Sequence, residues 1–118
     1  MNTFLVNLPL TGEYLTTVRL TTGGLCALAG FDVDTAEDYK VCVTESLLIL
    51  KRKGYARAEI TFTVGEALGC AMFGKEPTLE KENTAEDEIS YALLSALLGQ
   101  VEFIKTEEGE ISGIRFEG

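Results

Sequence analysis

A stretch of alternating apolar and polar residues in the middle of the chain restricts the possible fold more than any other feature. Over residues 58–64 every second side chain is apolar, and the side chains between them are polar. A period of two is typical of a β-strand that buries one face. Gly65 and Glu66 then form a tight turn into a second apolar stretch, residues 67–73. The sequence therefore predicts a β-hairpin over residues 58–73, whose apolar face has to pack against other elements.

In three other segments, apolar residues recur at helical spacing. The predicted helices cover residues 13–29, 34–53 and 85–98. Asp34 followed by Glu37 has the spacing of a capping box, and Thr84 with Asp87 offers a similar start to the third helix. Three basic residues close the second helix: Lys51, Arg52 and Lys53. Their charges suit the negative end of the helix dipole.

Shorter strand-like segments flank these elements. Strands are predicted at residues 3–8, 101–106 and 110–117, and the polar segment 74–87 is predicted to be a loop that leads into the third helix. The resulting order, β-α-α-β-β-α-β-β, indicates an α+β fold, a two-layer sandwich with a mostly antiparallel sheet and helices on one face. Because no linker or internal repeat interrupts it, residues 1–118 are expected to form a single domain.

The charge and composition of the chain exclude several kinds of partner and site. With 19 acidic and 10 basic residues, the formal net charge is −9. Such a surface repels nucleic-acid phosphates, so a nucleic-acid partner is not expected, whereas a basic protein would be attracted. The chain contains no histidine, which removes Ser-His and Cys-His nucleophile pairs and histidine-based metal sites.

The cysteines and the apolar segments indicate where such a chain works. Cys26, Cys42 and Cys70 are odd in number, scattered and set among apolar residues, as expected of buried free thiols in a reducing compartment. No C-x-x-C motif suggests zinc binding or redox chemistry. The N-terminal segment lacks the basic start of a signal peptide, and no apolar run is long enough to span a membrane. We therefore expect a cytoplasmic protein without a membrane partner.

The second predicted helix places five chemically distinct residues on one stripe. They are Asp38, Cys42, Glu45, Ile49 and Arg52. The stretch EDYKVCVTESLLILKRKGY resembles the N-box helix of the anti-sigma-factor serine kinases, within the histidine-kinase-like ATPase superfamily. The family pattern is of the type D-x-x-x-A-x-x-E-x-x-x-N and often ends in a tyrosine. Asp38, Cys42 and Glu45 match its spacing, Tyr55 matches its end, and Ile49 stands at the asparagine position. The order of the elements agrees over nearly the whole chain, so the resemblance implies the histidine-kinase-like ATPase fold.

The resemblance also implies what each motif position would do. The helix glutamate, here Glu45, would activate an acceptor serine or a Mg²⁺-bound water, and the asparagine would coordinate Mg²⁺. Isoleucine has no oxygen ligand to offer, so Ile49 removes this contact. In the family's D-x-G-x-G motif the aspartate accepts a hydrogen bond from adenine. Met72 stands at that aspartate, Gly74 at the first glycine and Glu76 at the second.

The third motif of the family, a glycine-rich opening of the last helix that holds the phosphates, is also missing. The matching stretch TAEDEISYALL contains no glycine, and three acidic residues would repel a triphosphate there: Glu86, Asp87 and Glu88. Asparagine, aspartate and glycines are thus lost together. The chain is therefore expected to be a degenerate member of the family that binds neither ATP nor Mg²⁺ nor another metal. Glu45 is its relic catalytic candidate, and Ile49, Met72 and Gly74 are relic nucleotide positions.

The expected function is regulation by protein–protein binding, with a sigma factor or an anti-sigma antagonist as the partner and a homodimer as the possible assembly. Two other functions stay open at this point. One is an active ATP-dependent serine kinase with a divergent site, in which Glu45 is the base and Gly74 belongs to the adenine loop. The other is a small-molecule sensor that uses the vacated nucleotide pocket, with Met72, Phe73 and Ile49 in its walls. Alternatively, these side chains fill that space, and Glu45 is a solvated or capped charge without chemistry.

Overall fold

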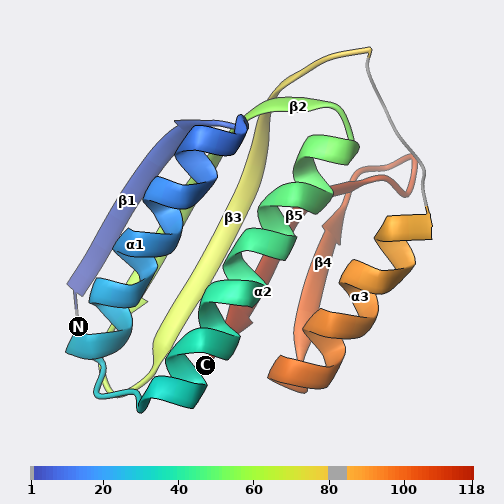
Figure 1. Cartoon of the computed structure of the whole chain (residues 1–118). Helices are drawn as coiled ribbons and strands as arrows, with labels where there is room; N and C mark the ends of the chain where they lie inside the picture. The colour runs from blue at the N-terminus through green and yellow to red at the C-terminus, as the bar shows by residue number, and fades with distance from the viewer. Residues whose placement is uncertain (1, 80–84) are drawn as a thin grey trace.

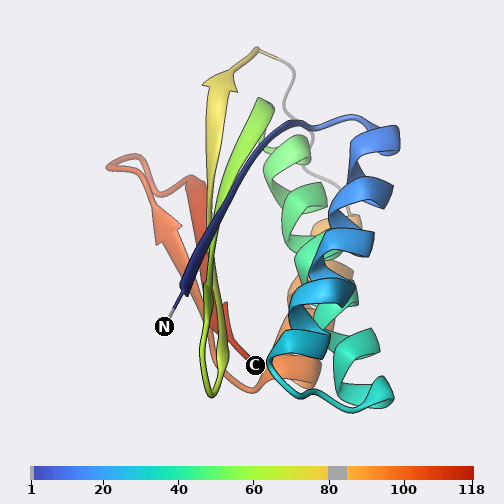
Figure 2. The ribbon, with the colours of Figure 1, turned by 90° about the vertical axis from the view of Figure 1, so that its left-hand side faces the viewer.

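The computed structural model describes residues 2–79 and 85–118, and it has the predicted element order. The elements are β1 (Asn2–Pro9), α1 (Gly12–Leu28), α2 (Val33–Arg52), β2 (Tyr55–Val64), β3 (Leu68–Pro77), α3 (Ala85–Leu98), β4 (Val101–Lys105) and β5 (Ile111–Glu117). They form two layers, with all three helices on one face of a five-stranded sheet (Figures 1 and 2). The predicted α+β sandwich is confirmed.

The sheet is antiparallel throughout the described strands. Its order is β1-β2-β3-β5-β4, so the chain leaves β3 through α3 and returns with β5 beside β3. The predicted central hairpin is confirmed as β2 and β3, which pair from Val64 opposite Leu68 outward. The loop predicted from residue 74 is wrong for residues 74–77. These residues extend β3 because β2 already begins at Tyr55 and supplies partners as far as Pro77.

The alternation along the hairpin determines which side chains form the core. The inward residues of β2 and β3 pack beneath the buried face of α2, and the outward residues are more polar. The inward set comprises Ala58, Ile60, Phe62, Leu68, Cys70 and Met72, and α2 contributes Tyr39, Cys42, Val43, Leu47, Ile49 and Leu50. Burying this much apolar surface is the main favourable term that holds the helix layer on the sheet.

The start of α2 differs from the predicted one. The residue that caps the helix is Asp32, whose carboxylate accepts a hydrogen bond from the backbone N–H of Thr35 at 2.8 Å. The predicted cap, Asp34, already lies in the first helical turn, where its charge still suits the dipole. Thr84, the predicted cap of α3, lies outside the described residues. Its predicted companion Asp87 is buried and contacts α2 instead.

The three cysteines are free and buried, as predicted. Burial raises the pKa of the Cys42 thiol to about 12, with smaller contributions from the charges of Asp38 and Glu45. Burial likewise raises the pKa of Cys70, Cys26 and the Tyr39 phenol above their usual values. Tyr39 also donates a hydrogen bond from its hydroxyl to the carbonyl oxygen of Leu68 at 2.9 Å. These groups are therefore held neutral in the folded protein.

The raised thiol pKa values predict a loss of stability at alkaline pH. In the unfolded chain the thiols ionise near pH ~8.5, whereas folded Cys42 keeps its proton up to about pH 12. Between pH ~8.5 and about pH 12 the folded state therefore binds more protons than the unfolded state. The free energy of unfolding keeps its full value below this pH window and falls as the pH rises through it. Each such group contributes a slope of about 1.4 kcal/mol per pH unit. Urea denaturation across the window measures the slope, which should be shallower in Cys42→Ala. A stability that does not change with pH would contradict the account.

Candidate site between helices α2 and α3

Glu45 lies half-buried on the side of α2 that faces α3, and it is hydrogen-bonded to the third helix. The hydroxyl of Ser90 donates to Oε2 of Glu45 at 2.8 Å. Nη2 of Arg52 donates to the same Ser90 oxygen at 2.7 Å. Ser90 therefore bridges a carboxylate and a guanidinium that lie on one stripe of α2. Glu45 is thus a carboxylate with a hydrogen-bonding partner on α3.

A second group of contacts, one turn along, ties the end of α2 to the start of α3. Nε of Arg52 donates to Oδ1 of Asp87 at 2.5 Å, and Nζ of Lys53 lies 3.3 Å from Oδ2. The side chains of Arg52 and Asp87 are only 10% and 8% exposed. Partial burial by itself would lower the pKa of Lys53, but the hydrogen bond to Asp87 and the interaction with Tyr91 raise it. The positive charges of Arg52 and Lys53 balance the negative charge of Asp87. Removing one of these side chains would leave a buried charge that is no longer fully balanced.

The charge of Arg52 was expected, with those of Lys51 and Lys53, to interact favourably with the helix dipole. The structure shows a more specific contact, with Asp87 on α3. Lys51 points to solvent, whereas Arg52 is buried against α3. The sequence contained a signal for this contact. Arg52 shares a stripe with Glu45, and Asp87 and Ser90 are spaced three apart, so they lie on the same face of the third helix. We refer to Glu45, Arg52, Lys53, Asp87 and Ser90 as the α2–α3 polar cluster.

Ile49 on α2 and Met72 on β3, the positions that the resemblance aligns with a Mg²⁺ ligand and an adenine acceptor, are both 0% exposed and belong to the same hydrophobic core. Met72 lies opposite Ile60 on one neighbouring strand and Ile114 on the other. The small-molecule-sensor alternative would need Phe73 in one pocket wall with these two residues, and the register of the strand does not place it there. Because successive strand residues point to opposite faces, Phe73 lies on the outer face, where its ring packs over Gly113.

Gly74, which the resemblance aligns with the first glycine of the adenine motif, has a packing role. A Cβ atom built on it would lie 2.3 Å from the ring of Tyr55. The tyrosine that matches the end of the family helix and the glycine that matches its adenine motif are thus brought together across β2 and β3. The close approach of the ring requires a residue without a side chain.

The Tyr55 contact predicts a penalty for Gly74→Ala. The added methyl group must displace the ring, which costs about 1–3 kcal/mol in the free energy of unfolding. In a Tyr55→Ala background the same substitution should cost far less, because the obstacle is gone. Gly24→Ala is the control, since no described atom outside the adjoining helix backbone and the two neighbouring residues lies within 4 Å of a Cβ built there. Urea denaturation of the four variants gives the coupling, and equal costs in both backgrounds would contradict this explanation.

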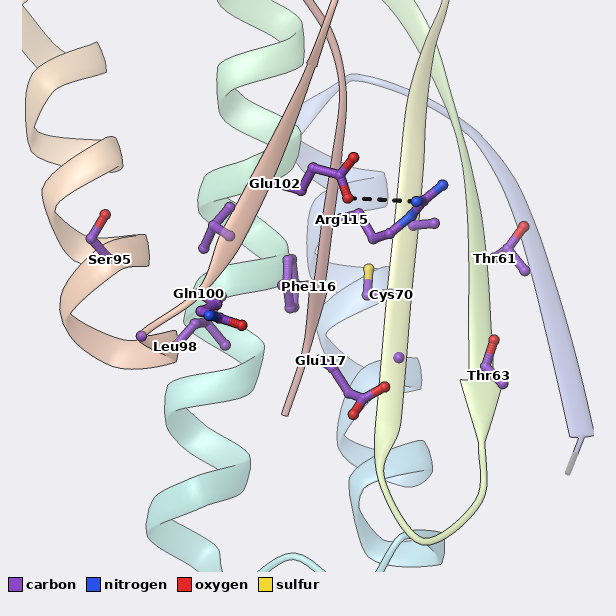
Figure 3. A pocket seen from close by; sticks show the side chains of 14 residues that line it. Thr61, Thr63, Cys70, Ser95, Leu98, Gln100, Glu102, Arg115, Phe116 and Glu117 are labelled. Atoms are coloured by element: carbon purple, nitrogen blue, oxygen red, sulfur yellow. Dashed lines mark ion pairs between the residues drawn. The ribbon is translucent and has the colours of Figure 1, made fainter.

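The described surface has two hollows, and one of them is lined in part by Lys53 of the α2–α3 polar cluster. One, of about 470 Å³, is lined by Lys53, Tyr91, Phe103, Lys105, Gly109, Glu110 and Ile111. The other, of about 990 Å³, spreads over the outer face of the sheet and the end of α3 (Figure 3). In the second hollow, Arg115 is paired with Glu102 at 3.5 Å. Glu45, Ile49, Met72 and Gly74 line neither hollow.

Neither the models of known protein families nor the curated proteins include a match to this chain. Within residues 2–79 and 85–118, no helix is long and apolar enough to cross a membrane. The same residues contain no group of three or more Cys, Asp or Glu side chains placed to hold a metal ion. A functional proposal therefore has to be argued from the fold and from the contacts between α2, α3 and the sheet.

Proposed function

We propose that the protein is an anti-sigma-factor-like regulatory protein that acts by binding another protein and has lost ATP binding and kinase activity. The observation that carries the proposal is the complete burial of Ile49 and Met72, both 0% exposed. These are the positions at which the resemblance places a Mg²⁺ ligand and an adenine acceptor. Neither side chain can supply those contacts, and both contribute to the core instead.

The scaffold and the charge of the chain support the same proposal. The element order and the helices on one face of an antiparallel sheet agree with a histidine-kinase-like ATPase scaffold. A net charge of −9 favours a basic partner, such as a sigma factor or an anti-sigma antagonist with a basic surface. A homodimer and a cytoplasmic location are parts of the proposal that come from the resemblance and the composition.

The two alternatives have less support from the contacts. An active serine kinase with a divergent site would need a carboxylate oxygen of Glu45 as its base, and Oε2 already accepts a hydrogen bond from Ser90. A small-molecule sensor would need a pocket walled by Ile49, Met72 and Phe73. The first two are buried in the core and the third lies on the other face of the sheet.

The proposal is tested by measuring the binding of purified sigma factors and anti-sigma antagonists to the immobilised full chain. We expect one of them to bind with a micromolar or lower Kd. The affinity should be the same with and without ATP and Mg²⁺. An unrelated protein of similar positive charge controls for attraction by charge alone. The proposal fails if no candidate binds better than this control, or if binding requires ATP.

A further inference from the structure

Helix α3 has an apolar outer face in addition to its buried one. Its inner face carries Leu94, Asp87 and Ser90. Its outer face carries four exposed apolar residues with the spacing of one helical stripe: Ile89, Ala92, Leu93 and Ala96. Ile89 is 60% exposed and Leu93 is 36% exposed. Single exposed apolar residues are ordinary, but a helix that is apolar on both faces is normally covered on both.

Helix α2 continues this apolar stripe. Val41 and Leu48, seven residues apart, lie half-buried on the solvent side of α2. α2 and α3 run side by side in the helix layer that faces the viewer in Figure 1. The α2–α3 polar cluster fixes the two helices to each other through buried hydrogen bonds and ion pairs. The surface is therefore preorganised. We call Val41, Leu48, Ile89, Ala92, Leu93 and Ala96 the outer apolar surface.

Acidic side chains border this surface. Glu86 and Glu88 are exposed in the first turn of α3, and Asp38 is exposed on α2. Glu86 already has one cationic neighbour, because Nη1 of Arg52, in the last turn of α2, lies 3.9 Å from its Oε2. Because α2 and α3 run in opposite directions, Asp38 lies toward one end of the surface and the two glutamates toward the other (Figure 1). An apolar centre with an acidic border is complementary to a helix with an apolar face and basic flanks.

We propose that the outer apolar surface is the docking site for a basic amphipathic helix of the protein partner. The inference rests on the proposed function and specifies where that binding occurs and which chemistry it selects. The partner helix would place apolar residues at spacings of three and four against Ile89, Leu93 and Leu48, and Lys or Arg beside Glu86, Glu88 and Asp38. A second copy of this chain is a poorer occupant, because it would bring the same acidic border and a further charge of −9.

The test uses a synthetic peptide of about 18 residues, five helical turns, with leucines on one face and lysines on the other. A scrambled peptide of the same composition separates docking from attraction by charge. Fluorescence anisotropy of the labelled peptides is measured against the full chain, the Ile89→Ser/Leu93→Ser variant and a matched control, Leu20→Ser/Leu28→Ser. The control residues are 75% and 76% exposed on α1.

We expect the patterned peptide to bind at least about tenfold more tightly than the scrambled one, and the Ile89→Ser/Leu93→Ser variant to lose that preference. The α1 control should keep it. Circular dichroism should show equal folding for all three proteins, because the changed residues are on the surface. The inference is overturned if both double variants bind the peptide equally, or if sedimentation shows that Ile89→Ser/Leu93→Ser converts a dimer into a monomer.

The same variants, measured against the sigma factors and antagonists, separate the two proposals. If a partner binds the unmodified chain and both variants equally, the docking surface is wrong and the proposed function stands. If the peptide depends on Ile89 and Leu93 but no sigma factor or antagonist binds, the surface stands and the proposed partner class is wrong. Loss of partner binding in the α3 variant alone supports both.

Discussion

Met72→Asp is expected to prevent folding, or to lower the free energy of unfolding by more than about 4 kcal/mol. The substitution introduces the aspartate that the resemblance would place here, at a position that is 0% exposed. The new carboxylate would lie on the central strand β3 between Ile60 and Ile114, without a charged or hydrogen-bonding neighbour among its strand partners. Burying an unpaired carboxylate is among the most costly changes in a protein core. Urea denaturation followed by circular dichroism measures the loss.

Two controls separate this effect from a general intolerance of the strand. Met72→Leu nearly conserves the side-chain volume and should cost less than about 1.5 kcal/mol. Ala71→Asp puts the same charge one residue away on the outer face, opposite Arg115, and should be close to neutral. The opposite outcome, a stable Met72→Asp protein that has gained affinity for ATP, would show that an adenine pocket is present and that the core described above is not filled.

Arg52→Met is expected to lower the free energy of unfolding by about 3 kcal/mol. The substitution keeps an apolar stem of similar length but removes the guanidinium that contacts both Asp87 and Ser90. Asp87 is then left buried beside Lys53, whose Nζ lies 3.3 Å from its Oδ2. Because Lys53 still neutralises part of the charge of Asp87, the expected decrease in the free energy of unfolding is at the lower end of the range for a broken buried ion pair. Thermal or urea denaturation of the variant measures the loss.

The reason for the loss is tested by removing both charges. Arg52→Met/Asp87→Leu removes both charges of the most buried pair and costs Lys53 only its contact with Asp87, so much of the lost stability should return. Lys51→Met, on the same turn but exposed, is the matched single control and should change stability by less than about 0.5 kcal/mol. If Lys51→Met and Arg52→Met cost the same, the α2–α3 polar cluster contributes nothing specific to stability.

Much of the fold could be predicted from the sequence, because the elements with a strong period are locally determined. The alternation over residues 58–64 predicted β2 and the inward direction of Ile60 and Phe62. The ends of the helices and strands were harder to predict from the sequence. The extension of β3 to Pro77 depends on a partner supplied by Tyr55, and the choice of Asp32 over Asp34 as cap depends on one backbone conformation. Neither is encoded in a local pattern.

The candidate site was predictable only in part, because its contacts join distant segments. The helical stripe placed Glu45, Ile49 and Arg52 on one side of α2, which the structure confirms. Ser90, which bonds to Glu45, is 45 positions away in the sequence, and the packing of α3 on α2 brings the two together. The small-molecule-sensor alternative grouped Met72 with Phe73 in one cavity wall, although adjacent strand residues point to opposite faces of a sheet.

The central claim, that this chain has lost nucleotide chemistry and works by protein binding, is tested most directly by calorimetric titration of the unmodified full chain with ATP and with ADP, each with and without Mg²⁺. The burial of Ile49 and Met72 and the engagement of Glu45 by Ser90 predict no saturable heat at millimolar nucleotide. Binding with a Kd below about 1 mM, and above all binding that Mg²⁺ strengthens, would contradict the claim.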